Sequence, residues 1–234
     1  MDLRELLHIE GVKEECDLRS TVGFMALHGG SQDRGTDQIA RRVADLCDAS
    51  YYGIVQPPWL RVHLTSRRHD PDHSVAFRRF LAHVRVAISV HGFGRDSFAL
   101  WVDPARGLLI DPYGPAVRDG QKDPLTGIIV GGLHDGLVRQ ARTLLSARCP
   151  GFHVADERLR LGFHPQNPVN LPPEKGVQIE LPPGLRGIGA YGERLTPDDA
   201  AVPSGLITAL VELARAADRR GAPTGSAPSG PAPT

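Results

Sequence analysis

Apolar runs of strand length alternate along this chain with segments whose apolar positions recur at helical spacing. The runs predict strands at residues 22–27, 50–56, 60–66, 86–90, 128–130 and 176–181, with two shorter strands at 98–102 and 108–111. The helical spacing predicts helices at residues 36–47, 71–84, 134–148 and 203–217. Helices between strands are typical of an α/β fold in which both faces of the sheet are covered. We therefore expect a three-layer α/β/α sandwich with a mixed, mostly parallel sheet.

Two of the buried strands end in the same way. His28 follows the apolar run 22–27 and precedes a glycine pair, and His91 follows the run 86–90 and precedes Gly92. Ligands of open α/β sheets bind beyond the carboxyl ends of the parallel strands, so both histidines are expected at the mouth of a site. The glycine turn can bring Asp33 back beside His28, and imidazole and carboxylate are usual zinc ligands. The alternative to a metal site is an ordinary turn in which His28 is simply an exposed polar residue.

Length and composition favour one soluble domain. The chain has 234 residues, and we expect a single domain over residues 1–218 followed by a disordered Pro/Gly/Ser/Ala tail at 219–234. The formal net charge is +0, so we expect neither nucleic acid nor a membrane as partner. Residues 1–20 are charged and lack an apolar core, which favours a cytoplasmic protein, and we expect a monomer. Three scattered cysteines favour neither a disulfide scaffold nor a cysteine zinc site.

A series of short motifs carries a family resemblance. In order they are ALHGGSQDRGTDQIA, SYYGI, HLTSRRHDP, SVHGFG, IIVGGLHDGL and NPVNLPPEKGVQIELPPGLR, spread over most of residues 21–215. Together they resemble the poly-γ-glutamate hydrolase family, a phage and bacterial group related to zinc carboxypeptidases. The resemblance implies a carboxypeptidase-like fold, one zinc ion, and cleavage of γ-linked glutamate amides in a γ-glutamyl polymer or peptide. Residues 94–124 do not align with the family pattern.

The resemblance also implies roles for particular residues. The metal ligands are His28, Asp33 and His91, and Glu180 in the GVQIEL strand corresponds to a family glutamate. The family usually has Ile-Glu where this chain has Gln32-Asp33, so the third ligand is one methylene shorter here. Two histidines and a carboxylate with one open position form a hydrolytic rather than a structural zinc site.

Four side chains are candidates for catalysis or substrate binding. Strand periodicity alone favours an outward-facing glutamate at position 180, but the family position implied by the resemblance makes Glu180 the candidate acid–base catalyst. Arg186 is a candidate for binding a substrate carboxylate or the developing oxyanion, against the alternative of a solvated surface arginine. Asn170 and His63 are candidate substrate-binding residues, and His63 is also the main rival for a ligand position. The remaining histidines are interpreted as surface or helix-face residues.

The most specific hypothesis is thus a zinc-dependent amidohydrolase acting on poly-γ-glutamate or a related γ-linked peptide. Three alternatives stay open. One is a metal-binding module of the same fold with weakened catalysis. Another is a phosphate-binding protein that uses Gly29, Gly30 and the following helix N-terminus. The last is a hydrolase of peptidoglycan-type peptides.

Overall fold

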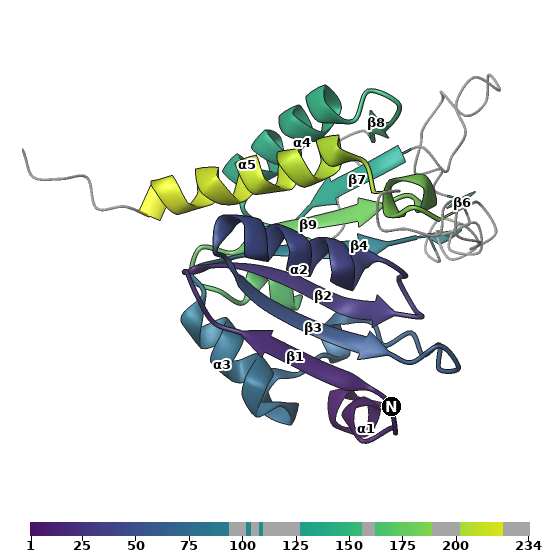
Figure 1. Ribbon diagram of the computed structural model, residues 1–234. Coiled ribbons are helices and arrows are strands. Elements are labelled where there is room, and N and C mark those ends of the chain that lie inside the picture. Colours follow the sequence, from purple (N-terminus) through teal and green to yellow (C-terminus); the bar gives the residue numbers. More distant parts are fainter. Residues whose placement is uncertain (94–101, 104–107, 110–126, 156–161, 189–201, 222–234) are drawn as a thin grey trace, which may run out of the picture.

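The computed structural model describes residues 1–93, 102–103, 108–109, 127–155, 162–188 and 202–221. Its centre is a seven-stranded sheet in the order β1-β3-β2-β4-β9-β7-β8 (Figure 1). The strands are β1 (Lys13–Asp17), β2 (Val22–Gly30), β3 (Ser50–Gln56), β4 (Val86–Gly92), β7 (Gly127–Gly131), β8 (His153–Val154) and β9 (Gly176–Leu181). The strands β3, β2, β4 and β9 run parallel, whereas β1 and β7 pair antiparallel with β3 and β9. The predicted mixed, mostly parallel sheet is confirmed.

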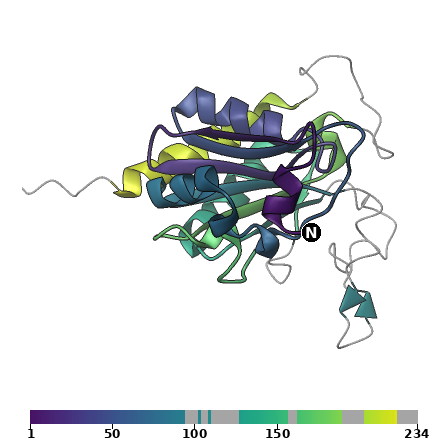
Figure 2. The ribbon, with the colours of Figure 1, turned by 90° about the horizontal axis from the view of Figure 1, so that it is seen from below.

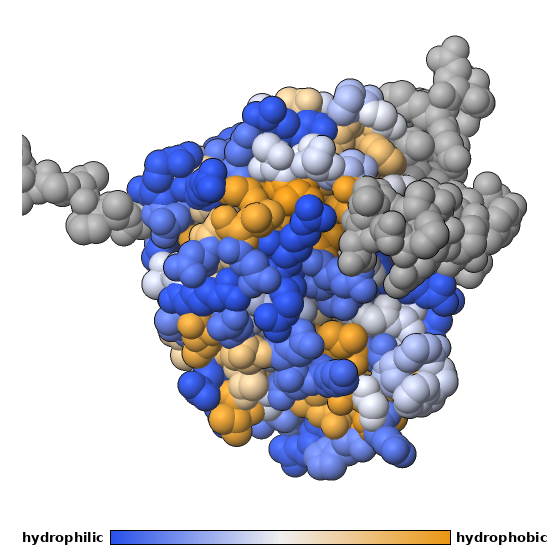
Figure 3. Space-filling model, in the orientation of Figure 1, coloured by the Kyte–Doolittle hydropathy of each residue, from blue (hydrophilic) through white to orange (hydrophobic). Residues whose placement is uncertain are grey.

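Helices cover both faces of this sheet. They are α1 (Leu3–Leu7), α2 (Thr36–Cys47), α3 (Val75–His83), α4 (Asp135–Arg148) and α5 (Ser204–Gly221). Figures 1 and 2 show α2 and α5 on one side and α3 on the other. Figure 3 shows hydrophobic residues at the seam between α5 and α2 and hydrophilic residues over much of the rest of that face. The predicted three-layer sandwich is confirmed.

Strand alternation divides the core into two apolar clusters. Phe24, Ile88 and Ile179 belong to the cluster under α2, α4 and α5. Met25 and Ala87 belong to the opposite cluster, which includes α1 and α3. On β4 and β9, the polar side chains that concern function occupy the positions that alternate with the first cluster.

The predicted strand at 60–66 is wrong. Residues 60–65 form no regular element, and the short helix η1 (Ser66–Arg68) follows them. The side chain of Gln56 accepts a hydrogen bond from the Val62 N–H and donates one to the Val62 carbonyl, so this backbone is satisfied without a neighbouring strand. Leu64 is nevertheless buried in the cluster of α1 and α3. The alternation of apolar residues at 60–64 therefore reflects a loop with one side packed against the core, and it does not indicate a strand.

Two other predictions fall partly outside the described residues. The predicted strands at 98–102 and 108–111 overlap β5 (Val102–Asp103) and β6 (Leu108–Leu109), which pair antiparallel, and the rest of both segments is not described. The last helix runs to Gly221, beyond the expected domain end at 218, and residues 222–234 lie outside the described part. Among the described residues, none of the helices combines the length and hydrophobicity needed to span a bilayer.

Candidate metal centre

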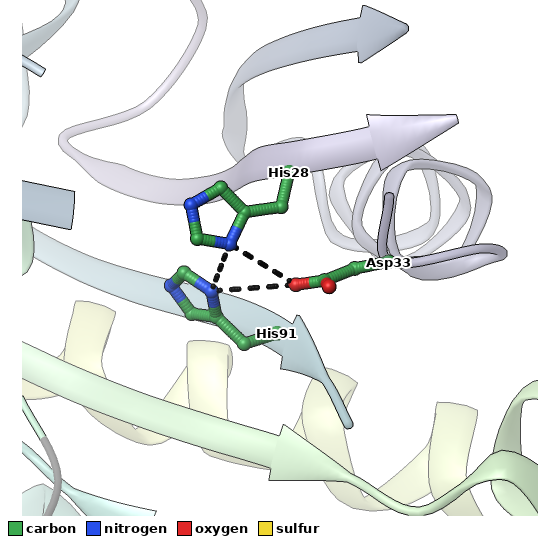
Figure 4. A group of neighbouring side chains, drawn as sticks. All are labelled: His28, Asp33 and His91. Carbon is green, nitrogen blue, oxygen red and sulfur yellow. Dashed lines mark hydrogen bonds and ion pairs between the residues drawn. The ribbon is translucent and has the colours of Figure 1, made fainter. Parts of the chain in front are cut away.

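His28, Asp33 and His91 lie together at the carboxyl ends of β2 and β4 (Figure 4). Asp33 belongs to the turn between β2 and α2, and its N–H donates to the His28 carbonyl at 2.7 Å. Its own carbonyl accepts from the N–H and the hydroxyl of Thr36 at the start of α2. The turn is thereby folded back onto the strand, which brings the carboxylate beside the imidazole as the sequence predicts.

One nitrogen of each ring and one carboxylate oxygen point at a common centre. His28 Nδ1 lies 3.2 Å from His91 Nδ1 and 3.2 Å from Asp33 Oδ2, and His91 Nδ1 lies 3.7 Å from Asp33 Oδ2. Ligand atoms about 2.0–2.1 Å from a tetrahedral zinc ion are about 3.3 Å from one another. Within the described part of the chain, this is the group of His, Cys, Asp and Glu side chains that fits a metal ion.

The other ring nitrogens are held by neighbouring groups. His28 Nε2 lies 2.7 Å from the Leu64 carbonyl, and His91 Nε2 lies 2.9 Å from Ser89 Oγ. Since a carbonyl can only accept, His28 carries its proton on Nε2 when neutral and presents a lone pair from Nδ1. Such partners fix the tautomer and the orientation of metal-binding histidines. The donor set is therefore chemically suited to a divalent metal.

Electrostatics keep the carboxylate of this group ionised. Burial alone would raise the pKa of Asp33, but His28 and His91 hold it well below its usual range. Burial alone would lower the pKa of His28, and Asp33 raises it above its ordinary value instead. Asp33 Oδ2 also accepts the Gly92 N–H at 3.2 Å. An ionised, oriented carboxylate is the form that binds a cation.

Glu180 lies next to the triad on β9. It pairs in register with His91 of the parallel strand β4, so both side chains point to the same face of the sheet. Burial raises the pKa of Glu180, and so does Asp33, while His91 and the Gln178 hydrogen bond oppose them. A half-buried carboxyl with a raised pKa beside a cation site is typical of an acid–base catalyst.

A chain of amide side chains orients Glu180. Gln178 Nε2 donates to Glu180 Oε1 at 2.8 Å, and Asn167 Nδ2 donates to Gln178 Oε1 at 3.0 Å. Asn167 Oδ1 accepts from the Val169 N–H, which fixes the amide at the other end of the chain. Gln178 is not among the site residues predicted from the sequence, although it lies two residues before Glu180 and so shares its face of the strand.

Two further histidines lie against His28. His63 is exposed, with its ring centroid 5.1 Å from that of His28, and His69 is buried at 5.5 Å. The sequence interpretation of His69 as a surface residue is wrong: burial lowers its pKa to about 3, with a further contribution from His28. His69 Nε2 has no hydrogen-bond partner among the described residues. The clue in the sequence was its place in the HLTSRRHDP motif together with His63.

Asn170 and Arg186 are both buried against backbone. Asn170 Oδ1 accepts from the Leu133 N–H, and its Nδ2 donates to the Gly162 and His164 carbonyls. This fully buried amide joins the backbone at Leu133 to that at 162–164, and its expected contact with substrate stays a prediction. The Arg186 guanidinium is also buried and donates to three carbonyls.

The glycine turn leaves little room for the phosphate alternative. The Gly30 N–H donates to Asp37 Oδ1 at 3.1 Å, and the Ser31 N–H donates to the Gln56 carbonyl. A carboxylate of α2 therefore occupies a donor that a phosphate would need.

Comparison with known proteins gives a family match over part of the chain. Residues 8–102 match the family model described as poly-gamma-glutamate hydrolase. Over this part of the chain, which is less than half of it, the sequence is similar to the poly-gamma-glutamate hydrolase family. The match contains His28, Asp33 and His91, and it confirms both the resemblance and the hydrolase class predicted from the sequence. No match is found among curated protein sequences.

Solved structures of similar fold agree with this family match. The structure of a bacteriophage poly-gamma-glutamate hydrolase has a TM-score of 0.65 at 20% identity, covering 92% of this chain and 94% of its own. A structure described as zinc-free apo YNDL has a TM-score of 0.62 at 18% identity, with coverages of 88% and 90%. An N-formylglutamate amidohydrolase from Ralstonia eutropha JMP134 has a TM-score of 0.56 at 13% identity, with coverages of 91% and 100%. At these identities the similarities establish the fold.

Proposed function

We propose that this protein is a zinc-dependent amidohydrolase that cleaves γ-glutamyl amide bonds in poly-γ-glutamate or a related γ-linked peptide. The observation that carries the proposal is the convergence of His28 Nδ1, His91 Nδ1 and Asp33 Oδ2 within 3.2–3.7 Å. The family match over residues 8–102 supports the substrate class. The zinc-free description of one structural neighbour supports the choice of metal.

The metal and the residues around the triad have different roles in the proposed reaction. Zinc, when bound, makes water a nucleophile near neutral pH and polarises the amide carbonyl. Glu180 accepts the proton of the attacking water and returns it to the leaving nitrogen, which its raised pKa favours. Gln178 keeps the Glu180 carboxylate in place for both transfers. His63, exposed beside His28, is the side chain that contacts the substrate.

The first experiments measure the metal content of the protein and its selectivity for the γ-linked amide bond. Purified protein should contain about one zinc ion per chain by elemental analysis, and it should shorten poly-γ-glutamate. The matched control substrate is α-linked polyglutamate, which has the same charge per residue but a different amide bond and should stay intact. Cleavage of the α-linked polymer at an equal rate would refute the γ-linkage.

Variants then separate binding of the metal from catalysis. His28→Ala and His91→Ala should abolish both zinc binding and turnover, whereas Glu180→Gln should keep the zinc and lose turnover. The control is His83→Ala, whose ring bonds to the Arg19 carbonyl away from the triad. Hydrolysis retained by either triad histidine variant would refute the assignment. Zinc bound without cleavage of any γ-linked peptide would favour a binding module, and cleavage of peptidoglycan-type peptides alone would change the substrate.

A further inference from the structure

Arg186 lies at the end of the short helix η7 (Pro183–Arg186), which follows β9. Its side chain is directed inward, and the residue is only 8% exposed. Nε donates to the Leu181 carbonyl at 3.2 Å, Nη1 to the Arg34 carbonyl at 2.8 Å, and Nη2 to the Phe93 carbonyl at 2.6 Å. One guanidinium thus binds backbone from three separate segments.

Each of these carbonyls lies just beyond a residue of the candidate centre. Leu181 follows Glu180, Arg34 follows Asp33, and Phe93 is the second residue after His91. The Leu181 carbonyl also accepts the Phe93 N–H at 3.2 Å, which joins the ends of β4 and β9 directly. Because the guanidinium is planar and its donors have fixed directions, it sets the relative positions of the three carbonyls.

The backbone passes close to the guanidinium at Gly92. A Cβ atom there would lie 2.6 Å from Arg186 Cζ and 2.7 Å from Nε and Nη1, so only glycine allows this approach. The N–H of the same Gly92 donates to Asp33 Oδ2. The residue packed on Arg186 is therefore also the one that orients the carboxylate of the triad.

The charge of Arg186 is compensated by the same site. Burial lowers the pKa of Arg186, while the carboxylates of Asp33 and Glu180 act in the opposite direction. A buried guanidinium needs such partners, and here its hydrogen bonds go to carbonyls while its charge is balanced by the site carboxylates.

We propose that Arg186 is a positioning residue that ties the Asp33 turn and the ends of β4 and β9 together, and so fixes the metal ligands and Glu180 relative to one another. Three of its five donors are engaged by backbone, which replaces the expectation that Arg186 anchors a substrate carboxylate. The consequence for zinc rests on the proposed function, whereas the tying of the three segments does not.

The first test is made on metal-free protein by hydrogen–deuterium exchange. The variants are Arg186→Lys, which keeps the charge but loses the fork, and Gly92→Ala, which displaces the guanidinium by sterics alone. Both should speed exchange at least tenfold in the segments around residues 33–36, 92–93 and 181–188. The matched control is Arg85→Lys, because Arg85 bonds Glu174 and the Ala217 carbonyl at the opposite end of β4. Its exchange should rise only near those partners.

The second test measures zinc affinity and steady-state kinetics on γ-linked polymer. A positioning role predicts a zinc Kd raised tenfold or more in Arg186→Lys and Gly92→Ala, and a lowered kcat with KM near the wild-type value when zinc saturates. A substrate anchor predicts the opposite pattern, a raised KM with zinc affinity and exchange unchanged, and that result would overturn the proposal.

The two proposals fail in different ways. Wild-type protein that neither holds zinc nor cleaves γ-linked polymer would refute the proposed function, while the exchange data would still decide the role of Arg186. If neither variant folds, proton exchange of the Arg186 guanidinium is measured by NMR in metal-free wild-type protein. Exchange much slower than in free arginine supports the proposed bonds to the three carbonyls, and exchange as fast as in free arginine refutes them.

Discussion

Lengthening Asp33 to glutamate should weaken zinc binding, although the resemblance noted from the sequence leads one to expect glutamate at this place. The shorter carboxylate already reaches the centre, since Oδ2 lies 3.2 Å from His28 Nδ1 and 3.7 Å from His91 Nδ1. It is 7% exposed, and the backbone of the turn is held by the hydrogen bonds of Thr36 to the Asp33 carbonyl. An added methylene would carry the carboxylate about 1.5 Å further into this packed space.

The size of the effect follows from the Gly92 contact. Its N–H donates to Asp33 Oδ2 at 3.2 Å, and a displaced carboxylate loses that bond. A hydrogen bond to a charged group contributes about 1.5–3 kcal/mol. Since about 1.4 kcal/mol corresponds to a tenfold change in affinity, Asp33→Glu should raise the zinc Kd roughly 10- to 150-fold.

The assay is competition for zinc against a chromophoric chelator of known affinity. Asp37→Glu is the matched control. Asp37 lies in the first turn of α2, close to the Asp33 turn, and accepts the Gly30 N–H, but it does not belong to the triad. This control should bind zinc within about threefold of wild type. An Asp33→Glu protein that binds zinc as tightly as wild type would refute the predicted loss of affinity, and tighter binding would show that the Asp33 carboxylate is too short for the site.

Contacts around the triad give three more predictions. His69→Gln should make the free energy of unfolding depend less on pH between about pH 3 and 6.5. The pKa of His69 is about 3 in the folded protein and 6.5 in the unfolded chain, so the unfolded chain binds more protons in this pH range. Wild-type stability then falls by a few kcal/mol as pH drops through it, and equal slopes of unfolding free energy against pH in both proteins would contradict this. Gln178→Met removes the hydrogen-bond donor to Glu180 and should lower kcat about tenfold or more while the zinc content stays the same. An unchanged kcat in steady-state kinetics would refute this prediction. Gly30→Ala should destabilise the fold by more than about 2 kcal/mol, because φ is 73° and a Cβ would collide with the Gln56 backbone; an unshifted denaturation midpoint would count against it.

The fold and the triad were predictable because both depend on local patterns. Apolar runs of strand length identify β2 and β4, and the connecting helices make these strands parallel, so their carboxyl ends lie at one edge. Histidines placed at those ends therefore come to the same edge of the sheet, although the pattern does not fix the face to which each ring points. The turn from His28 to Asp33 needs only five residues and two glycines.

What could not be predicted depends on contacts between distant segments. The strand β1 consists of Lys13–Asp17, which are polar or half-exposed and form the sheet edge, so no apolar pattern marks it. The burial of His69 and the amide chain to Glu180 depend on how the loops at 60–70 and 162–170 fold over the sheet. The role of Arg186 depends on carbonyls, which every residue has and no sequence pattern identifies.

A register shift in β2 explains why strand alternation alone would misplace His28. Ala26 faces the cluster under α2, so strict alternation would turn His28 to that face, away from His91. Three steps along β2, from Ala26 to Gly29, match only two along β3, and this extra residue re-aims the imidazole toward Leu64 and His91. A Cβ at Gly29 would meet the Asp37 side chain and the Ile54 carbonyl. The glycine after His28 is therefore required by the bulge that completes the candidate metal centre, and a phosphate-binding role is not needed to account for it.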